Sequence, residues 1–573
     1  MSVGLAILAP PREILDGNRV RGPRRFARAC AGYHPAVKSA RERRLRAAWL
    51  PILILGALPF LSGLGQRNDG PVVVYLVDTL RPDRMSAYGA ARDTTPAVRA
   101  FASESVVFRN AFTLSTWTRP AVATLLTSRL PSEVGAINRY GRLSESVPYL
   151  PEIFQKHGWV TCAAVANGNV DDPRLGFRRG FDRFDDVWGK TPEEKPSAVE
   201  VVEKARAFIA AQPSPRFFLY VHVIDPHIPY RTPPEFQTAF EASAGPTPRE
   251  KLLLEYDREV RTSDEGFLYL ADSLKAKGWW RDALVVFVSD HGEEFYEHGN
   301  LYHGATLYDE QTRVPLVVKF PGNEGRATTR PDPVSLADVA PTIVDAMGWE
   351  KEKGWIGESV RGRRFPENRE IYATEDLDAF RLYGLRRGPE KVIVRVYPTL
   401  ERRVFRLDRD PRENEGASVP CGEASAGSAS DLLPRLEAWR ERDLEGFPQV
   451  HLWRSSAGEE VRIDLLVSLG GGTKPFLSAT DACRYASSVK PGMIMLRGPL
   501  SPNQPFDFRI AGDDRGALPH YRLGVTDSRG KVVPLGDARG VTVRAAQGDF
   551  LTGLTVDETE ARRLKALGYL AGD

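Results

Sequence analysis

Five nearly unbroken apolar runs recur along the first half of the chain. They are PVVVYLVD (71–78), WVTCAAVAN (159–167), FFLYVHVID (217–225), ALVVFVSD (283–290) and VPLVVKF (314–320). Such runs, rich in β-branched residues, are typical of parallel strands that are covered on both faces. Helical periodicity lies between them at 95–106, 146–158 and 198–211. We therefore predict an α/β domain with a mainly parallel sheet over residues 68–350.

Beyond residue 350 the apolar segments become shorter and alternate with polar residues. The clearest are EIYAT (370–374), FRLYGLRRG (380–388), KVIVRVY (391–397) and RRVFRL (402–407). We expect residues 351–447 to be an antiparallel C-terminal part of the same catalytic region. Short strand-like segments separated by Gly, Asp and Pro predict an additional small all-β domain at 448–550. An amphipathic stretch predicts a C-terminal helix within 551–573.

The N-terminal segment differs from the rest in charge. Residues 1–46 hold eleven Lys or Arg against three acidic residues, and we interpret them as a basic leader without fixed structure. Residues 47–66 carry no charge. About twenty apolar residues in a helix just cross a bilayer core, so this segment predicts a signal peptide or a transmembrane signal anchor. We expect the rest of the chain to be exported to the periplasm or extracytoplasmic side, either anchored in the inner membrane or secreted after cleavage.

The overall composition is that of a globular protein with two or more domains. Of 573 residues, 42% are hydrophobic and 27% charged, and the net charge is only +3. This balance, with no zinc-finger spacing and no basic block interleaved with aromatics, gives no case for nucleic acid as a partner. The four cysteines form no CxxC pair and predict no disulfide framework.

Metal-binding side chains gather where the predicted strands end. Asp78, Asp225 and Asp290 each close an apolar run, and five of the nine histidines lie between residues 222 and 303. Each residue alone is as well explained as a cap, a turn or polar surface. Ligands of open parallel sheets bind beyond the carboxyl ends of the strands, where these side chains would converge. Carboxylates and imidazoles together favour a divalent metal site.

Longer stretches resemble the sulfatase family within the alkaline phosphatase superfamily. They are VVYLVDTLRPDRMSAYG (73–89), TTPAVRAFASESVVFRNAF (94–112), TWTRPAVATLLTSRLP (116–131), FFLYVHVIDPHIPY (217–230), VVFVSDHGEEFYEHG (285–299), HGATLYDEQTRVPLVVKFPG (303–322), VSLADVAPTIVDAMG (334–348) and FRLDRDPRENEG (405–416). The resemblance covers about residues 70–440 and has no counterpart for 448–550. It implies an alkaline-phosphatase/sulfatase-like core and a metal-dependent ester hydrolase.

Carried over residue by residue, the resemblance also implies roles. The implied metal ligands are Asp78, Thr118, Asp290 and His291. Thr118 takes the position of the nucleophile. His227 and His303 stand where the family holds the anionic ester, and we assign both a catalytic role, His227 as general acid for the leaving group. Asp225, with these two histidines, is assigned to a second metal or to the substrate anion.

Position 118 departs from the sulfatase pattern. Sulfatases carry Cys or Ser in C/S-x-P-x-R, which is oxidised to formylglycine, whereas here Thr118 is followed by Arg119, Pro120 and Ala121, with Val122 in place of the supporting arginine. A secondary alcohol would not give the aldehyde, so we expect no formylglycine. Threonine here instead resembles the phosphodiesterases, phosphonate hydrolases and phosphoethanolamine or phosphoglycerol transferases of the superfamily. Its plainer interpretation is an N-cap of the helix that starts at this point.

The donor set bears on the metal. A histidine ligand with carboxylates favours Zn²⁺ or Mn²⁺ over Ca²⁺. Thr79 stands where calcium sulfatases often have a second aspartate, which points the same way. Family members with the same Asp-His pair also take calcium, so calcium stays an alternative.

The sequence thus predicts a metal-dependent hydrolase of phosphate, phosphonate or sulfate esters that acts through Thr118 and a covalent intermediate, with phosphorus chemistry favoured. One alternative is an envelope phosphotransferase with a glycan or lipid acceptor. Another is a non-catalytic glycan-binding protein that keeps the fold and uses residues 448–550.

Overall fold

The computed structural model describes residues 68–136, 142–188, 195–242, 245–377, 381–397, 401–419 and 431–443, together with strand segments between 449 and 546. The predicted basic leader, the apolar segment 47–66 and the C-terminal helix of 551–573 lie outside the described residues. Among the helices that are described, none combines the length and the apolar character needed to cross a membrane.

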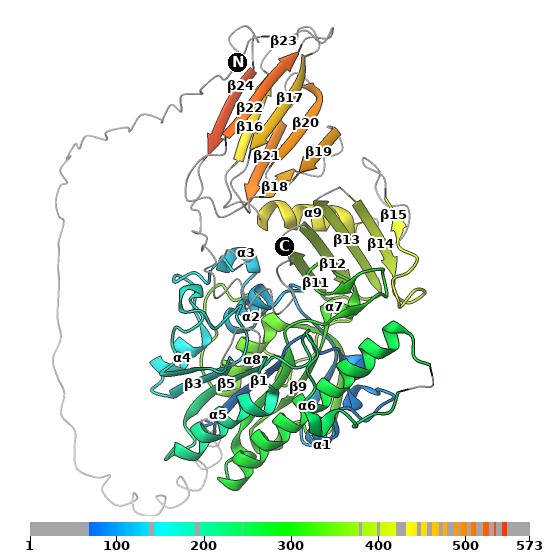
Figure 1. Ribbon diagram of the computed structural model, residues 1–573. Helices are drawn as coiled ribbons and strands as arrows, with labels where there is room; N and C mark the ends of the chain where they lie inside the picture. Colours follow the sequence, from blue (N-terminus) through cyan, green and yellow to red (C-terminus); the bar gives the residue numbers. More distant parts are fainter. Residues whose placement is uncertain are drawn as a thin grey trace, which may run out of the picture. The chain divides into compact units, whose positions relative to one another are not determined.

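An eight-stranded sheet forms the centre of the first region (Figure 1). From one edge to the other its strands are β10 (Thr328–Ser335), β2 (Val106–Phe112), β9 (Arg313–Lys319), β6 (Leu284–Ser289), β1 (Val72–Val77), β5 (Phe217–Val223), β3 (Val160–Val165) and β4 (Arg183–Asp186). The block from β6 to β4 is parallel. Strand β9 runs antiparallel to both of its neighbours, β2 and β6.

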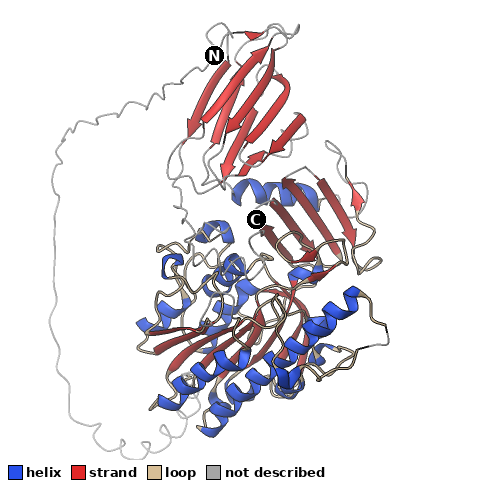
Figure 2. Cartoon of the chain, in the orientation of Figure 1, coloured by secondary structure: helices blue, strands red, loops and turns tan. Residues whose placement is uncertain are grey.

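Helices cover both faces of this sheet, which is why its central strands β1, β5 and β6 are buried along their whole length (Figures 1 and 2). On one face, Val74 and Leu76 of β1 join the core beneath α2 (Thr118–Thr127), α4 (Leu150–Lys156) and α8 (Val339–Ala346). On the other face, Tyr75 and Val77 pack beneath α1 (Pro96–Ala102), α5 (Ala198–Ala211) and α6 (Pro248–Ala276). Shorter elements are α3 (Pro131–Val134), α7 (Asp309–Thr312) and the hairpin of β7 (Glu294–Phe295) and β8 (Leu301–Tyr302).

A second sheet is antiparallel, as expected from the alternating pattern after residue 350. It runs in the order β11 (Glu370–Glu375), β12 (Arg381–Arg387), β13 (Glu390–Tyr397), β14 (Glu401–Arg406) and β15 (Ala417–Ser418). Helix α9 (Leu432–Asp443) packs Leu433, Leu436 and Trp439 against side chains of β12 and β13.

Further along the chain, the described segments form two antiparallel sheets and no helix. One contains β18 (Lys474–Leu477), β21 (Phe506–Ala511), β16 (Gln449–Arg454) and β24 (Val541–Ala546). The other contains β19 (Ala486–Lys490), β20 (Met493–Leu500), β17 (Val461–Ser468), β22 (His520–Thr526) and β23 (Val532–Val533). The predicted fold class is therefore confirmed: a mainly parallel α/β core, an antiparallel sheet and additional β structure.

Three local expectations differ from the structure. The helix expected over 95–106 ends at Ala102, because Val106 already begins β2, a strand that the sequence pattern did not separate from it. The run 314–320 lies in a strand, β9, but this strand is antiparallel. The longest of the described helices, α6, is not predicted by the sequence pattern.

Candidate functional site

Asp78 and Asp290 lie side by side at the carboxyl ends of β1 and β6. The two strands pair in parallel with Val77 opposite Ser289, so the residues that follow them are neighbours. Both aspartates and the adjacent His291 are fully buried. The convergence expected at this edge of the sheet is therefore present for three of the proposed metal ligands.

The three side chains present their ligand atoms to a common space. His291 Nε2 lies 3.4 Å from Asp290 Oδ2 and 3.9 Å from Asp78 Oδ1. One such atom from each residue falls within 4.8 Å of the other two, as the ligands of one ion must. His291 Nδ1 is 3.0 Å from the carbonyl oxygen of Gly292, and a proton donated there leaves Nε2 as the coordinating nitrogen.

The carboxylates fit a divalent cation because two of their oxygens lack donors. Asp78 Oδ1 and Asp290 Oδ2 are buried and have no hydrogen-bond partner among the described residues. By contrast, Asp290 Oδ1 accepts from the backbone N–H groups of Thr79 at 3.2 Å and His291 at 2.9 Å. Burial raises the pKa of Asp78 to about 7 and also raises that of Asp290. Two buried acceptors without donors are costly, and a shared cation would satisfy both.

Thr118 stands at the first turn of α2 and faces this group. Its Oγ1 lies 3.3 Å from His291 Nε2, and its side chain is fully buried. The capping position itself is taken by Trp117, so Thr118 is the first helical residue rather than the N-cap. A hydroxyl at the N-terminus of a helix lies where backbone N–H groups and the helix dipole favour negative charge.

His303 and His227 continue the line of imidazoles from His291. The ring centroid of His303 lies 4.5 Å from that of His291 and 4.9 Å from that of His227. His303 Nδ1 is 2.7 Å from Glu293 Oε1, and His227 Nδ1 is 2.5 Å from the carbonyl oxygen of Ile228. Burial lowers the pKa of His303 to about 4 and also lowers that of His227 well below its ordinary value. In its neutral form His227 therefore keeps Nδ1–H, and Nε2 is its proton-accepting nitrogen.

Asp225 is held differently from the other two strand-end aspartates. Its Oδ1 forms an ion pair with Lys195 Nζ at 3.1 Å, and its Oδ2 accepts from the N–H of Ala198 at 2.7 Å. Both oxygens are thus engaged within the protein, and Asp225 is not one of the three clustered ligands. Its assignment to a second metal or to the substrate anion stays a prediction.

Comparison with known proteins identifies the central region. Residues 71–349 match the family model described as Sulfatase. This region, just under half of the chain, is similar to the sulfatase family. The chain is 26% identical over 333 residues to an ulvan-active sulfatase of Formosa agariphila; the match covers 51% of this chain and 64% of that relative, which is under two thirds of its length.

Solved structures show the same fold at low identity. The phosphonate monoester hydrolase of Agrobacterium radiobacter aligns with a TM-score of 0.57 and 19% identity, over 65% of this chain and 96% of that one. A protein solved in complex with its substrate D-glucosamine-2-N,6-O-disulfate aligns with a TM-score of 0.55 and 19% identity, over 66% and 97%. The predicted resemblance is confirmed, whereas the role of threonine at position 118 is not tested by these matches.

Two further residues contact Asp78 from neighbouring strands. Sequence reasoning counted His222 among the clustered histidines without giving it a role, and it missed Asn167. Asn167, just beyond β3, donates from Nδ2 to Asp78 Oδ2, and His222 Nε2 of β5 lies 3.3 Å from the same oxygen. These contacts hold Oδ2, while Oδ1 lies 3.9 Å from His291 Nε2. The strand-end rule that selected Asp78 would also have selected Asn167, which ends the run 159–167.

Thr79 adopts a backbone conformation that is rare for a β-branched residue. Its φ is 54°, in the left-handed region, and such strain concentrates at functional sites. The conformation aims its N–H at Asp290 Oδ1, and its carbonyl accepts from the Tyr256 hydroxyl at 2.7 Å. Thr79 therefore contributes to the site through its backbone.

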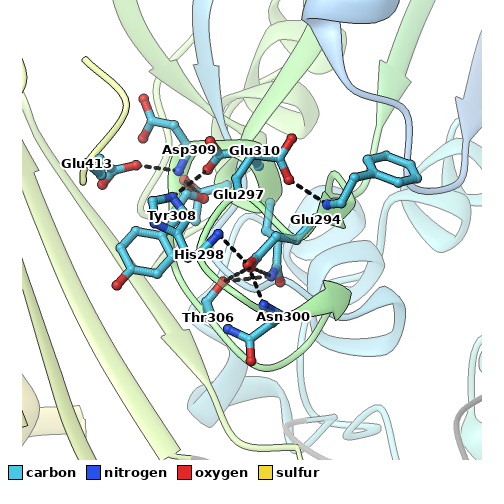
Figure 3. Close-up of polar contacts among 12 residues, drawn as sticks. Glu294, Glu297, His298, Asn300, Thr306, Tyr308, Asp309, Glu310 and Glu413 are labelled. Atoms are coloured by element: carbon cyan, nitrogen blue, oxygen red, sulfur yellow. Dashed lines mark hydrogen bonds and ion pairs between the residues drawn. The ribbon is translucent and has the colours of Figure 1, made fainter. Parts of the chain in front are cut away.

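The loop that carries His303 is anchored by a buried glutamate (Figure 3). Glu294 Oε1 accepts from the N–H groups of His298 and Asn300, both at 3.1 Å. Glu294 Oε2 accepts from the hydroxyl of Thr306 and from Gln311 Nε2, both at 3.0 Å. These bonds fasten the chain on both sides of His303.

Proposed function

We propose that this protein is a metal-dependent hydrolase of phosphate, phosphonate or sulfate esters, with Thr118 as its nucleophile. The observation that carries the proposal is the position of Thr118 Oγ1, 3.3 Å from His291 Nε2, beside two buried carboxylate oxygens without donors. The sulfatase-family domain and the phosphonate hydrolase-like fold support ester hydrolysis as the reaction class.

Asp78, Asp290, His291 and Thr118 would hold the metal, with Zn²⁺ or Mn²⁺ favoured by the mixed nitrogen and oxygen donors and Ca²⁺ as the alternative. When bound, the ion would lower the pKa of the Thr118 hydroxyl and neutralise charge on the ester. Asn167 and the N–H of Thr79 keep the two carboxylates turned inward, and burial excludes competing water.

Thr118 Oγ would attack phosphorus or sulfur as the bond to the leaving oxygen breaks, and water would then release the group from Thr118. His303, oriented by Glu293, would face the equatorial oxygens of the ester. The Nδ1–H contact of His227 with Ile228 leaves Nε2 as the nitrogen that would give a proton to the leaving alcohol as the ester bond breaks and would take one from water in the hydrolysis step.

We favour phosphorus over sulfur because position 118 holds a secondary alcohol rather than a precursor of formylglycine. For the organic part of the ester we favour a glycan, since relatives are named for ulvan and for a glucosamine disulfate. A cavity of 390 Å³ between the His303 loop and the antiparallel sheet is lined by Tyr308, Arg395 and Arg403, planar polar groups that suit a hydroxylated ring. Export across a membrane, with or without an anchor, stays part of the proposal.

The test is a side-by-side assay of aryl phosphate, aryl phosphodiester, aryl phosphonate and aryl sulfate after loading with Zn²⁺, Mn²⁺ or Ca²⁺. We expect phosphorus esters to be turned over faster, Thr118→Ala to lower kcat by more than about 1,000-fold and Thr118→Ser to retain part of it. Product partitioning with added glycerol separates hydrolysis from transfer. Faster sulfate turnover would reject phosphorus, and unchanged activity in Thr118→Ala would reject the nucleophile.

A further inference from the structure

Glu375 is a buried carboxylate at the end of β11, in the antiparallel sheet, yet its contacts are with the chain just before Thr118. Its side chain is 1% exposed. The neighbouring backbone makes the same approach, since the N–H of Thr374 donates to the carbonyl oxygen of Leu114 at 2.8 Å. Strand β11 and the segment that leads into α2 are therefore joined side by side.

One oxygen of Glu375 gathers three donors from this segment. Oε2 lies 2.9 Å from the hydroxyl of Ser115, 2.8 Å from the N–H of Thr116 and 3.0 Å from the hydroxyl of Thr116. Oε1 accepts from the N–H of Asp376 at 3.1 Å. Four contacts to one buried side chain leave the carboxylate a single orientation, and with it the backbone at 115 and 116.

Glu375 has no ion-pair partner among the described residues, so its contacts are hydrogen bonds alone. Burial raises its pKa to about 7. Burying a carboxylate without a cation costs free energy. An apolar side chain would fill the same space without that cost, so packing alone does not explain a glutamate here. The donors of Ser115 and Thr116, in the nucleophile segment (residues 114–118), stabilise the charge of the carboxylate. The position of α2 agrees, because negative charge is favoured near the N-terminus of a helix.

The hydroxyl of Thr116 links this contact to the other side of the site. It lies 3.0 Å from Glu375 Oε2 and 3.0 Å from the carbonyl oxygen of Thr306, so its single proton serves one or the other. Thr306 is in turn bonded to Glu294, which anchors the His303 loop (Figure 3). Residue 116 thus contacts Glu375, which holds the segment before Thr118, and Thr306, which belongs to the anchor of the His303 loop.

We infer that Glu375 is a positioning residue for Thr118: it fixes residues 115 and 116, and thereby the distance of the Thr118 hydroxyl from the metal ligands. The inference rests on the proposed role of Thr118 as nucleophile. A glutamine of the same size would not replace it, because its NH₂ group would face either the N–H of Asp376 or, in the flipped orientation, the donors of residues 115 and 116. A displacement of about 1 Å at a reacting atom costs about 100-fold in rate.

The experiment compares Glu375→Gln with Glu370→Gln, a half-buried glutamate at the other end of the same strand that contacts Tyr372 and Arg435. For Glu375→Gln we expect kcat to fall about 10–100-fold with KM and bound metal little changed. Amide hydrogen exchange should speed up at 114–120 and not at 71–77. Glu370→Gln should leave all four quantities unchanged.

Ser115→Ala and Thr116→Val each remove one of the two hydroxyl hydrogen bonds to Oε2 without altering the carboxylate, which keeps the test decisive if Glu375→Gln folds poorly. We expect each substitution to lower kcat. The decrease caused by Thr116→Val should be smaller in the Glu375→Gln variant than in the wild type, because the two residues act through the same contact. Unchanged kcat and unchanged exchange in all three variants would overturn the inference. If the wild type hydrolyses none of the esters, the proposed function fails, and the exchange measurement still decides whether Glu375 fixes the segment.

Discussion

Two groups of buried carboxylates lie at neighbouring strand ends of the same sheet, and they are stabilised in opposite ways. Asp78 and Asp290 face each other with one donor-free oxygen each. Asp225, at the end of β5, shares Lys195 with Glu259 of α6: Lys195 Nζ lies 3.1 Å from Asp225 Oδ1 and 2.5 Å from Glu259 Oε2. In the proposed function the first pair is completed by a divalent cation from solution, whereas the second already has a built-in cation, the ammonium group of Lys195.

The difference shows what a strand-end aspartate does and does not indicate. All three aspartates carry the same sequence signal, and burial raises the pKa of each. What separates them is a lysine that comes from a loop thirty positions before Asp225 in the chain. Lys195 also donates to the carbonyl oxygens of His227 and Pro229, at 2.5 and 3.3 Å, so the built-in cation orders the His227 segment as well.

The largest effect should come from removing the built-in cation. Lys195→Met leaves Asp225 and Glu259 buried without a counter-charge, and we expect the free energy of unfolding to fall by about 3–5 kcal/mol. Urea denaturation measures it. Lys204→Met, at an exposed position of α5, is the matched control and should change stability by less than about 0.5 kcal/mol. Equal effects of the two substitutions would show that Lys195 does not neutralise this cluster.

The sequence was sufficient for the parts of the fold that are governed by continuous apolar burial. The runs 71–78, 217–225 and 283–290 contain β1, β5 and β6, since a strand covered on both faces must be apolar throughout. Helix α6 was not predicted, because it lacks such continuous apolar burial. It buries charged and polar residues, among them Asp257, Glu259 and Asp264, which interrupt the apolar stripe that marks a helix.

For the site, residues at strand ends could be predicted from the sequence, whereas residues that reach the site through contacts between distant segments could not. Asp78, Asp290 and His291 follow from one local rule, and Asn167 obeys it too. Glu375 carries no such signal: it is one acidic residue in an alternating strand, and only the pairing of Thr374 with Leu114 brings it to the nucleophile segment. Contacts of this kind depend on how two sheets meet, which the local pattern does not encode.

A second prediction contrasts the two groups directly. Asp290→Asn should lower the affinity for Zn²⁺ by more than about 100-fold, because a ligand should matter more than the outer contacts that orient ligands. Asp225→Asn should leave that affinity within a few-fold. Titration calorimetry and metal analysis of the purified variants measure both. The metal-free Asp290→Asn protein should be at least as stable as the wild type, since one of two facing buried carboxylates is gone. Parallel loss of metal in both variants would contradict the distinction.

The smallest effect should be on the pH dependence of stability. It concerns a third way of stabilising a buried carboxylate, in which backbone N–H groups donate to it. Asp264 of α6 accepts from Ala97 and Val98, each at 2.9 Å, at the start of α1. Burial raises its pKa from 3.8 to about 7, so between these values the folded state binds a proton that the unfolded chain has released. The resulting stabilisation is full below about pH 4 and lost above about pH 7, so stability falls as pH rises through this window.

Asp264→Asn binds no proton and should show a shallower fall in the urea midpoint as pH rises from about 4 to about 7. Asp272→Asn, which is exposed on the same helix, should follow the wild type. Parallel curves for all three proteins would mean that the N–H groups hold Asp264 ionised throughout.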